Sequence, residues 1–297
     1  MHPGSAVAWT DEFDAEGRTW LITPDFTFMP KDKVAVYPRV DFHGVHLDTD
    51  VQLPIAFMRR TPRPKYERGE DGSIAPNGEQ WPRLTWVALT GETVQQGERS
   101  WYVTREHGLL LDKSDATVVL PMARTPWGTQ VEGATARDKD EGNSGGLKPP
   151  DGKRTWVEVS VLQGWMIAFE DTRPVFATLI APGRGGVPVP GVDPIETAST
   201  PTGFFRVDGK FMTGTMVNKT FVHADVPFIL NFHGAHALHM AYWHDTWGEK
   251  TSGGCINLAP QDAPWFFHWA EPAMPEGWHG MRSDKEAGAA TYVIVHR

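Results

Sequence analysis

A single cysteine and a nearby histidine are the residues of this chain best suited to covalent chemistry. Cys255 is the only cysteine, and it directly follows Gly253 and Gly254. His239 lies 16 positions before Cys255, behind an apolar run that is typical of a strand. A thiol in a glycine-rich loop, with a histidine one strand away, is the arrangement of a cysteine nucleophile and its general base.

Both residues have a structural alternative. A lone cysteine is most often a buried core residue. The crowded histidines could instead hold zinc together with Asp225 or Asp245; they are His233, His236, His239 and His244. The spacing of three between His233, His236 and His239 fits neither an i, i+4 pair on a helix nor one face of a strand, which makes a metal site the weaker interpretation.

The local sequence also explains how the thiol could be activated. A cysteine thiol has an ordinary pKa near ~8.5, so it is a poor nucleophile at neutral pH until a base such as His239 takes its proton. Glycines at 253 and 254 let the backbone bend, so that amides around Cys255 face a carbonyl oxygen. We therefore nominate the Gly254 amide as part of an oxyanion hole.

The residues around Cys255 resemble a known family. A histidine, a spacer and then Ser252-Gly253-Gly254-Cys255-Ile256-Asn257-Leu258 are similar to the signature of the L,D-transpeptidases of bacterial cell walls, whose catalytic domain is of the YkuD type. Residues 199–207, Ser-Thr-Pro-Thr-Gly-Phe-Phe-Arg-Val, resemble the Thr-Pro-x-Gly strand of that family. Residues 262–267 resemble the helix that follows its nucleophile loop. The resemblance covers roughly residues 154–297.

The resemblance implies a role for several residues. Cys255 corresponds to the nucleophile, His239 to the base, and the backbone carbonyl of Met240 to the group that orients the histidine ring. The expected substrate-binding residues are Ser252, Gly253, Asn257, Tyr242, Trp243 and His244. Gly253 departs from the family pattern, in which histidine is frequent at that position. The implied chemistry needs neither a cofactor nor a metal.

The strand pattern predicts a mostly β protein in two parts. We expect a β-rich domain at 1–131, with a Src-homology-3-like stretch from Thr85 to Leu120, and a Gly-rich linker at 132–153. An L,D-transpeptidase-type β-sandwich follows at 154–297. In it, residues 156–162 alternate as a half-buried strand, Asp208-Gly209 favours a hairpin, and the one convincing helix spans 260–269. A further strand is expected at 34–37.

The bulk composition excludes some classes of binding partner. A length of 297 residues is compatible with two domains, and a net charge of −9 argues against nucleic acid as a partner. No run approaches the ~20 apolar residues of a membrane-spanning helix. The first eight residues have no basic segment and no long apolar stretch, so they do not form a signal peptide. Because the family works outside the cytoplasm, we expect a mature or truncated form of an extracytoplasmic protein.

The expected reaction is acyl transfer on peptidoglycan stem peptides. The Cys255 thiolate would attack the bond before the terminal D-residue of a tetrapeptide stem, and the acyl group would pass to an amine of a second stem. Carbapenem-type inhibitors are expected to acylate the same thiol. The alternatives are hydrolysis by an L,D-carboxypeptidase, attachment or removal of a wall protein, and a wall-binding protein with a dead catalytic domain. The oligomeric state does not follow from the sequence.

Overall fold

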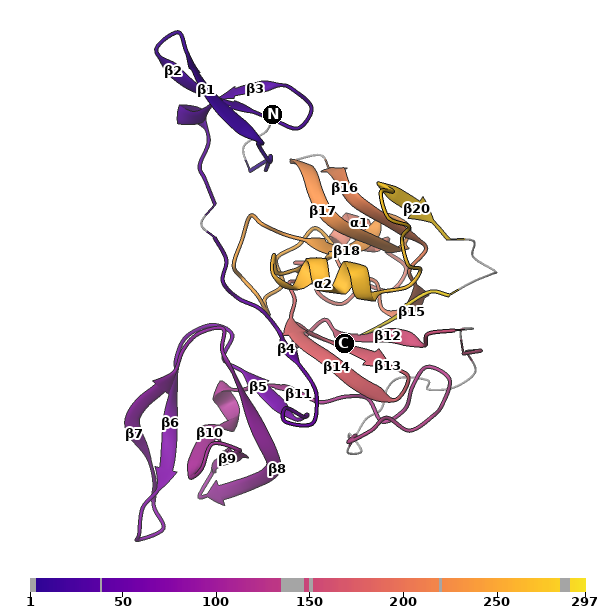
Figure 1. The fold of residues 1–297 in the computed structure, drawn as a ribbon. Helices are drawn as coiled ribbons and strands as arrows, with labels where there is room; N and C mark the ends of the chain where they lie inside the picture. Colours follow the sequence, from indigo (N-terminus) through magenta and orange to yellow (C-terminus); the bar gives the residue numbers. More distant parts are fainter. Residues whose placement is uncertain (1–3, 38, 135–146, 150–151, 219–220, 284–288) are drawn as a thin grey trace.

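The computed structural model describes residues 4–37, 39–134, 147–149, 152–218, 221–283 and 289–297. These residues form four β-sheets and little helix, which confirms the expected mostly β class. The linker predicted at 132–153 lies largely outside the described residues. Figure 1 shows one small sheet near the N-terminus, a larger one formed by β5 (Ile55–Phe57) to β11 (Thr117–Val119), and the remaining two stacked around helix α2 (Asp262–Trp269).

Two sheets of the C-terminal half build a sandwich. The first has the order β15-β21-β12-β13-β14-β4. Its strands are β4 (Val45–His46), β12 (Thr155–Ser160), β13 (Trp165–Glu170), β14 (Arg173–Leu179), β15 (Gly203–Arg206) and β21 (Tyr292–His296). The second has the order β19-β18-β17-β16-β20. Its strands are β16 (Gly209–Val217), β17 (Val222–His233), β18 (His236–Met240), β19 (Ile256–Leu258) and β20 (Gly280–Arg282).

The core between these sheets explains why they stack. Strand side chains alternate between two faces, and the inward-facing ones form one apolar cluster. It includes Val157 and Val159 of β12, Leu238 of β18, and Ile256 and Leu258 of β19. Helix α2 (Asp262–Trp269) adds Phe266 and Phe267 to the same cluster. The expected helix is therefore present, and it begins two residues later than predicted. A second short helix, α1 (Pro194–Thr197), was not predicted from the sequence.

Strand β12 differs from its prediction as a half-buried strand, because all six of its residues are buried. Val157 and Val159 face the sandwich, while Trp156 packs on the opposite side with Phe42, Phe57 and other side chains from the N-terminal half. The polar Glu158 on that side is satisfied. Its carboxylate accepts a hydrogen bond from the Met122 amide at 2.7 Å and contacts Nε2 of His296 at 3.0 Å. The N-terminal half therefore covers the second face of this sheet.

Apart from β4, the strands of the N-terminal half form two antiparallel sheets. The smaller contains β1 (Asp11–Ala15), β2 (Arg18–Ile22) and β3 (Phe28–Pro30). The larger has the order β11-β5-β8-β9-β10-β6-β7. Its strands are β5 (Ile55–Phe57), β6 (Arg63–Arg68), β7 (Ile74–Trp81), β8 (Trp86–Gln96), β9 (Arg99–Thr104), β10 (Leu109–Asp112) and β11 (Thr117–Val119). The Src-homology-3 resemblance of this region is not confirmed.

Two local predictions are wrong. Residues 34–37 form no strand; they follow a 3-10 turn, Lys31–Lys33, in an extended connection between the two N-terminal sheets (Figure 1). Asp208-Gly209 does not close a hairpin, because β15 pairs with β21 whereas β16 pairs with β17 and β20. Strand β15 pairs with the distant β21, and β16 pairs with the following strand β17; these pairings bring buried residues such as Val293 and Leu230 into the core.

The proposed division at 132–153 is crossed by many contacts. Strand β4 pairs with β14, and Phe42 stacks on Trp247 with ring centroids 6.1 Å apart. Arg59 and Arg83 donate hydrogen bonds to the backbone oxygens of Gly248 and Asp245, at 3.0 and 2.6 Å. The division into domains remains a prediction, and the structure adds a core that both halves share.

Candidate active site

The pairing of two strands sets the geometry of the site. Strands β18 and β19 are parallel neighbours, and their register places His239 opposite Asn257. Leu238, Ile256 and Leu258 face the core, so the period of two turns His239 and Asn257 to the other face of the sheet. Cys255 is the residue directly before β19, which brings the thiol to the same edge as the histidine. A motif spread over 19 positions thereby becomes one cluster.

Ser252 folds the loop that carries the thiol. Its hydroxyl accepts a hydrogen bond from the Gly254 amide at 3.1 Å and donates one to the Cys255 carbonyl at 2.5 Å. Such a local side-chain bond fixes a tight turn. In this arrangement the Gly254 amide, nominated for the oxyanion hole, is engaged by Ser252. The structure places Ser252 as a support of the loop.

Gly254 occupies a conformation that suits only glycine. Its φ is +127°, and a Cβ there would lie 3.0 Å from the Ser199 carbonyl oxygen and 3.1 Å from Nε2 of His236. Gly253 has no such constraint, since a Cβ at that position would meet only Phe221, at 3.7 Å. The ring of Phe221 thus lies beside the place that a side chain at position 253 would enter.

Thr200 holds the same loop from the other side. Its buried hydroxyl donates to the Gly254 carbonyl at 3.0 Å and accepts from the Gly183 amide at 2.8 Å. Thr200 belongs to the Thr-Pro element, which sequence reasoning used for recognition without giving the threonine a role. The sequence feature that could have pointed to Thr200 is its position directly before Pro201 in that element.

His239 is buried, with 2% of its surface exposed, and both ring nitrogens have partners. Nδ1 donates to the Met240 carbonyl at 2.8 Å, and Nε2 lies 3.0 Å from the side-chain nitrogen of Asn257. Burial lowers the pKa of His239 to about 4, with a smaller opposing effect from the Met240 carbonyl. The ring is therefore neutral at physiological pH, with its proton on Nδ1 and its lone pair on Nε2.

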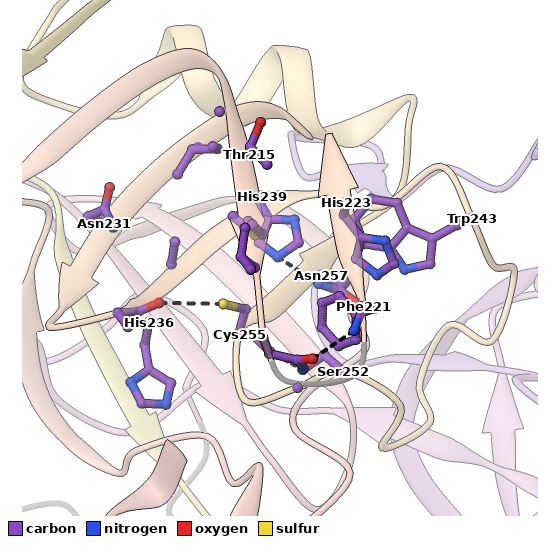
Figure 2. A pocket seen from close by; sticks show the side chains of 18 of the residues that line it. Thr215, Phe221, His223, Asn231, His236, His239, Trp243, Ser252, Cys255 and Asn257 are labelled. Atoms are coloured by element: carbon purple, nitrogen blue, oxygen red, sulfur yellow. Dashed lines mark hydrogen bonds between the residues drawn. The ribbon is translucent and has the colours of Figure 1, made fainter. Parts of the chain in front are cut away.

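The thiol of Cys255 points toward the start of β18. Sγ donates to the Ala235 carbonyl at 3.8 Å, and burial raises the pKa of Cys255 while the Ala237 amide partly opposes that rise. Figure 2 shows the sulfur linked to a main-chain oxygen, whereas the His239 ring is linked to Asn257. The resting pair is accordingly a neutral thiol beside a neutral imidazole.

Thiol and imidazole line one cavity of about 750 Å³. Its walls also include Thr213, Thr215 and Asn231 from the neighbouring strands, and the rings of Phe221, His223 and Trp243 (Figure 2). These three rings are stacked in sequence, with centroids 4.3 and 4.2 Å apart. Arg184 is the only Lys or Arg among the described lining residues, which include no Asp or Glu. The described walls of the cavity therefore carry one permanently cationic side chain and no carboxylate.

The other nominated residues lie in different places. Ser252, Gly253, Asn257, Trp243 and His244 all line this cavity. Tyr242 does not; it lines a second cavity of about 840 Å³ together with residues 4–7 and 33–37. Its hydroxyl donates to the Ala224 carbonyl at 3.1 Å, so the structure makes it a neighbour of the site rather than part of its wall.

Two further observations describe the site and the chain. Among the described residues, no group of three or more His, Cys, Asp or Glu side chains is placed to hold a metal ion. Within the same residues, no helix is long and apolar enough to cross a membrane.

The C-terminal part of the chain resembles a known family. Residues 154–280 match the YkuD model, described as the L,D-transpeptidase catalytic domain. The match covers less than half of the chain, and over these residues the chain is similar to that catalytic domain. No curated protein matches the chain.

Solved structures give distant matches. The L,D-transpeptidase of Stackebrandtia nassauensis is 20% identical over 50% of this chain and 58% of its own, with a TM-score of 0.33. That of Mycobacterium smegmatis is 13% identical over 99% of this chain and 94% of its own, with a TM-score of 0.36. LdtMt1 in complex with imipenem is 13% identical over 98% and 94%, with a TM-score of 0.35. The chain thus spans just under three fifths of the Stackebrandtia protein.

Proposed function

We propose that this protein is a cysteine-dependent peptidoglycan L,D-transpeptidase that acts outside the cytoplasm. One observation carries the proposal: in a domain similar to this family, the β18–β19 pair places a neutral His239, its Nδ1 bound to the Met240 carbonyl, at the cavity that Cys255 also lines. A neutral base with its lone pair on Nε2 and a thiol in one cavity are the two groups that acyl transfer requires.

The reaction begins with a rotation of the thiol. Turning Cys255 about χ1 moves Sγ from the Ala235 carbonyl toward Nε2 of His239, which takes the proton as sulfur attacks the carbonyl of the penultimate stem residue. Backbone amides of the 253–255 loop stabilise the oxyanion, the Gly254 amide after release from Ser252. The C–N bond then breaks, and the imidazolium protonates the departing D-residue amine.

The second half reverses the proton transfers. An amine of another stem enters, loses a proton to His239 and attacks the thioester, and the thiol leaves with that proton. The product is an amide cross-link, and the enzyme returns to its neutral pair. The anionic groups of the stem, including the carboxylate of its terminal residue, fit a cavity whose only Lys or Arg among the described lining residues is Arg184.

The test is incubation of the full chain with a disaccharide-tetrapeptide, followed by mass spectrometry of the products. Cross-linked dimers that have lost one terminal D-residue are expected. If tripeptide is the only product, the reaction is hydrolysis rather than transfer, and the protein is an L,D-carboxypeptidase. Unchanged substrate with folded wild-type protein would overturn the proposed function.

A further inference from the structure

A chain of hydrogen bonds connects the base to a loop residue that the reaction does not use. The Thr246 amide lies 3.3 Å from Nδ1 of His244. Nε2 of His244 lies 3.1 Å from Oδ1 of Asn257, and Nδ2 of Asn257 lies 3.0 Å from Nε2 of His239. Nδ1 of His239 ends the chain at the Met240 carbonyl, 2.8 Å away. Four contacts therefore run from residue 246 to residue 240 through the site.

The two ends fix the direction of every bond in this chain. A backbone amide can only donate, so Nδ1 of His244 accepts and the proton of that ring resides on Nε2. His244 then donates to the Asn257 oxygen, which leaves the Asn257 NH₂ group facing His239. The donated hydrogen meets the lone pair on Nε2 of His239, and the ring proton stays on Nδ1, where the Met240 carbonyl accepts it.

We propose that His244 is a positioning residue that keeps the lone pair of the base on Nε2, by holding the amide of Asn257 in one of its two orientations. In the opposite orientation the amide oxygen would face His239. That oxygen accepts a proton on Nε2, and a neutral ring with its proton there has no lone pair on the cavity side. Among the described residues, His244 is the side chain that contacts Oδ1 of Asn257. If His244 is removed, no other described side chain holds the Asn257 amide in one orientation rather than the other.

The other groups around His239 do not determine which orientation the Asn257 amide adopts. The titratable rings that face His239 are His223 on β17 and His244, and both act on its charge without contacting Nε2. Trp243 packs near the ring, with centroids 5.9 Å apart. The Met240 carbonyl favours a proton on Nδ1, so the two ends of the chain cooperate, and removing one end weakens the preference for that tautomer.

Two substitutions at one position separate this role from simple packing. The amide nitrogen of His244→Gln reaches the place of the imidazole Nε2, so it donates to Asn257 as histidine does. The amide of His244→Asn reaches only the place of Nδ1, so it keeps the Thr246 contact and loses the one to Asn257. The pair therefore differs in the bond that the proposal requires.

The first readout needs no substrate. Imidazole ¹⁵N shifts of the full chain labelled on histidine report which ring nitrogen of His239 carries the proton, with the signals assigned through His239→Gln. We expect the Nδ1–H form in the wild type and in His244→Gln, and a mixture with the Nε2–H form in His244→Asn. Identical His239 signals in His244→Asn and wild type would overturn the proposal.

The second readout rests on the proposed function. For a tetrapeptide donor we expect kcat of His244→Asn to fall about tenfold at unchanged KM, as the loss of one hydrogen bond allows, and His244→Gln to stay near wild type. Equal losses in both variants would mean that His244 only packs. If the wild type shows the Nδ1–H form but no turnover, the proposed function fails while the positioning role stands.

A third variant covers the case in which His244→Asn does not fold. Asn257→Asp removes the only donor of that side chain, so Nε2 of His239 must carry a proton to satisfy it. The ¹⁵N spectrum is then expected to show a protonated Nε2. An unprotonated Nε2 beside the carboxylate would contradict the control of the base through Asn257.

Discussion

The side-chain amide of Asn257 donates to Nε2 of His239 across 3.0 Å, and the parallel pairing of β18 and β19 holds the two residues opposite each other. The lone pair that receives the Cys255 proton in the proposed mechanism is therefore already in a hydrogen bond at rest. The thiol meanwhile donates to the Ala235 carbonyl. In that mechanism His239 and Cys255 exchange hydrogen-bond partners before the chemistry starts, and the resting protein holds no thiolate–imidazolium ion pair.

The pH dependence of turnover follows from this neutral pair. Burial lowers the pKa of His239 to about 4 and raises the pKa of Cys255. His239 loses its function as a base only when it is protonated, so kcat/KM should fall on the acid side near pH 4 rather than near the ordinary histidine pKa of ~6.5. Alkylation of Cys255 by iodoacetamide should in turn accelerate only at alkaline pH. An acid limb near pH 6.5, or fast alkylation at pH 6, would indicate an ion pair.

Two histidines of the crowded stretch should respond differently to removal. His239→Ala deletes the base and should reduce kcat/KM by about 10²–10⁴-fold. His233→Ala is the matched control, because His233 is exposed at the end of β17 and does not line the cavity. Turnover measured for both proteins checks the assignment. If His233→Ala loses more turnover than His239→Ala, the assignment of the base to His239 is wrong.

The neighbouring glycines of the nucleophile loop form a second matched pair. Gly254→Ala introduces a Cβ 3.0 Å from the Ser199 carbonyl at a φ of +127°, so it should displace the loop and abolish most activity. Gly253→Ala meets only Phe221, at 3.7 Å, and should keep wild-type activity within a few-fold. Turnover and thermal unfolding of the two variants make the comparison. Equal losses would show that the loop needs flexibility at both positions.

Much of the site could be predicted from local sequence patterns. The prediction fails where a contact depends on strands that are distant in sequence. Cys255 in a glycine loop and His239 beside Leu238 are visible in the sequence, since a period of two separates core residues from site residues. The contact of His244 with Asn257 depends on the β18–β19 register and on the path of the 241–255 connection, which no local pattern specifies. The three-stranded sheet of residues 11–30 also went unpredicted, because its strands are short and Leu21 is their only buried residue.

The second face of β12 shows the same limit. Alternation in residues 156–162 predicts one exposed face, yet Trp156 is fully buried there against Phe42 and Phe57. Residues about a hundred positions away in sequence decide that burial. Trp247, which follows His244 by three positions, belongs to this shared cluster, so the N-terminal half also anchors the connection that carries His244.

A buried carboxyl at the junction of the two halves predicts how stability varies with pH. Asp262 accepts hydrogen bonds from the Gly44 amide at 2.8 Å and the Thr178 hydroxyl at 2.5 Å, and burial raises its pKa to about 6. A raised pKa means that the folded state binds the proton more tightly. The stabilising contribution is full below the ordinary pKa of 3.8 and is lost as pH rises through about 6.

Asp262→Asn stays neutral and should therefore gain stability over wild type as pH rises from 4 to 8, by up to about 3 kcal/mol. Its amide can still accept from Gly44 and donate to the Thr178 hydroxyl, which itself donates to the Leu179 carbonyl at 3.2 Å. Urea unfolding at several pH values measures the difference. Asp50→Asn, at an exposed carboxyl, is the control. A difference that does not change between pH 4 and 8 would contradict the burial argument.

The most direct test of the account is whether Cys255 itself takes up an acyl group. A carbapenem offers a strained β-lactam carbonyl to the thiolate, and ring opening leaves the whole drug attached as a thioester. Intact mass spectrometry of the folded full chain should show one added drug molecule, peptide mapping should place it on Cys255, and Cys255→Ala should show none at unchanged thermal stability. Folded wild-type protein that forms no adduct at high drug concentration, or an adduct that persists in Cys255→Ala, would contradict the assignment of Cys255 as the nucleophile.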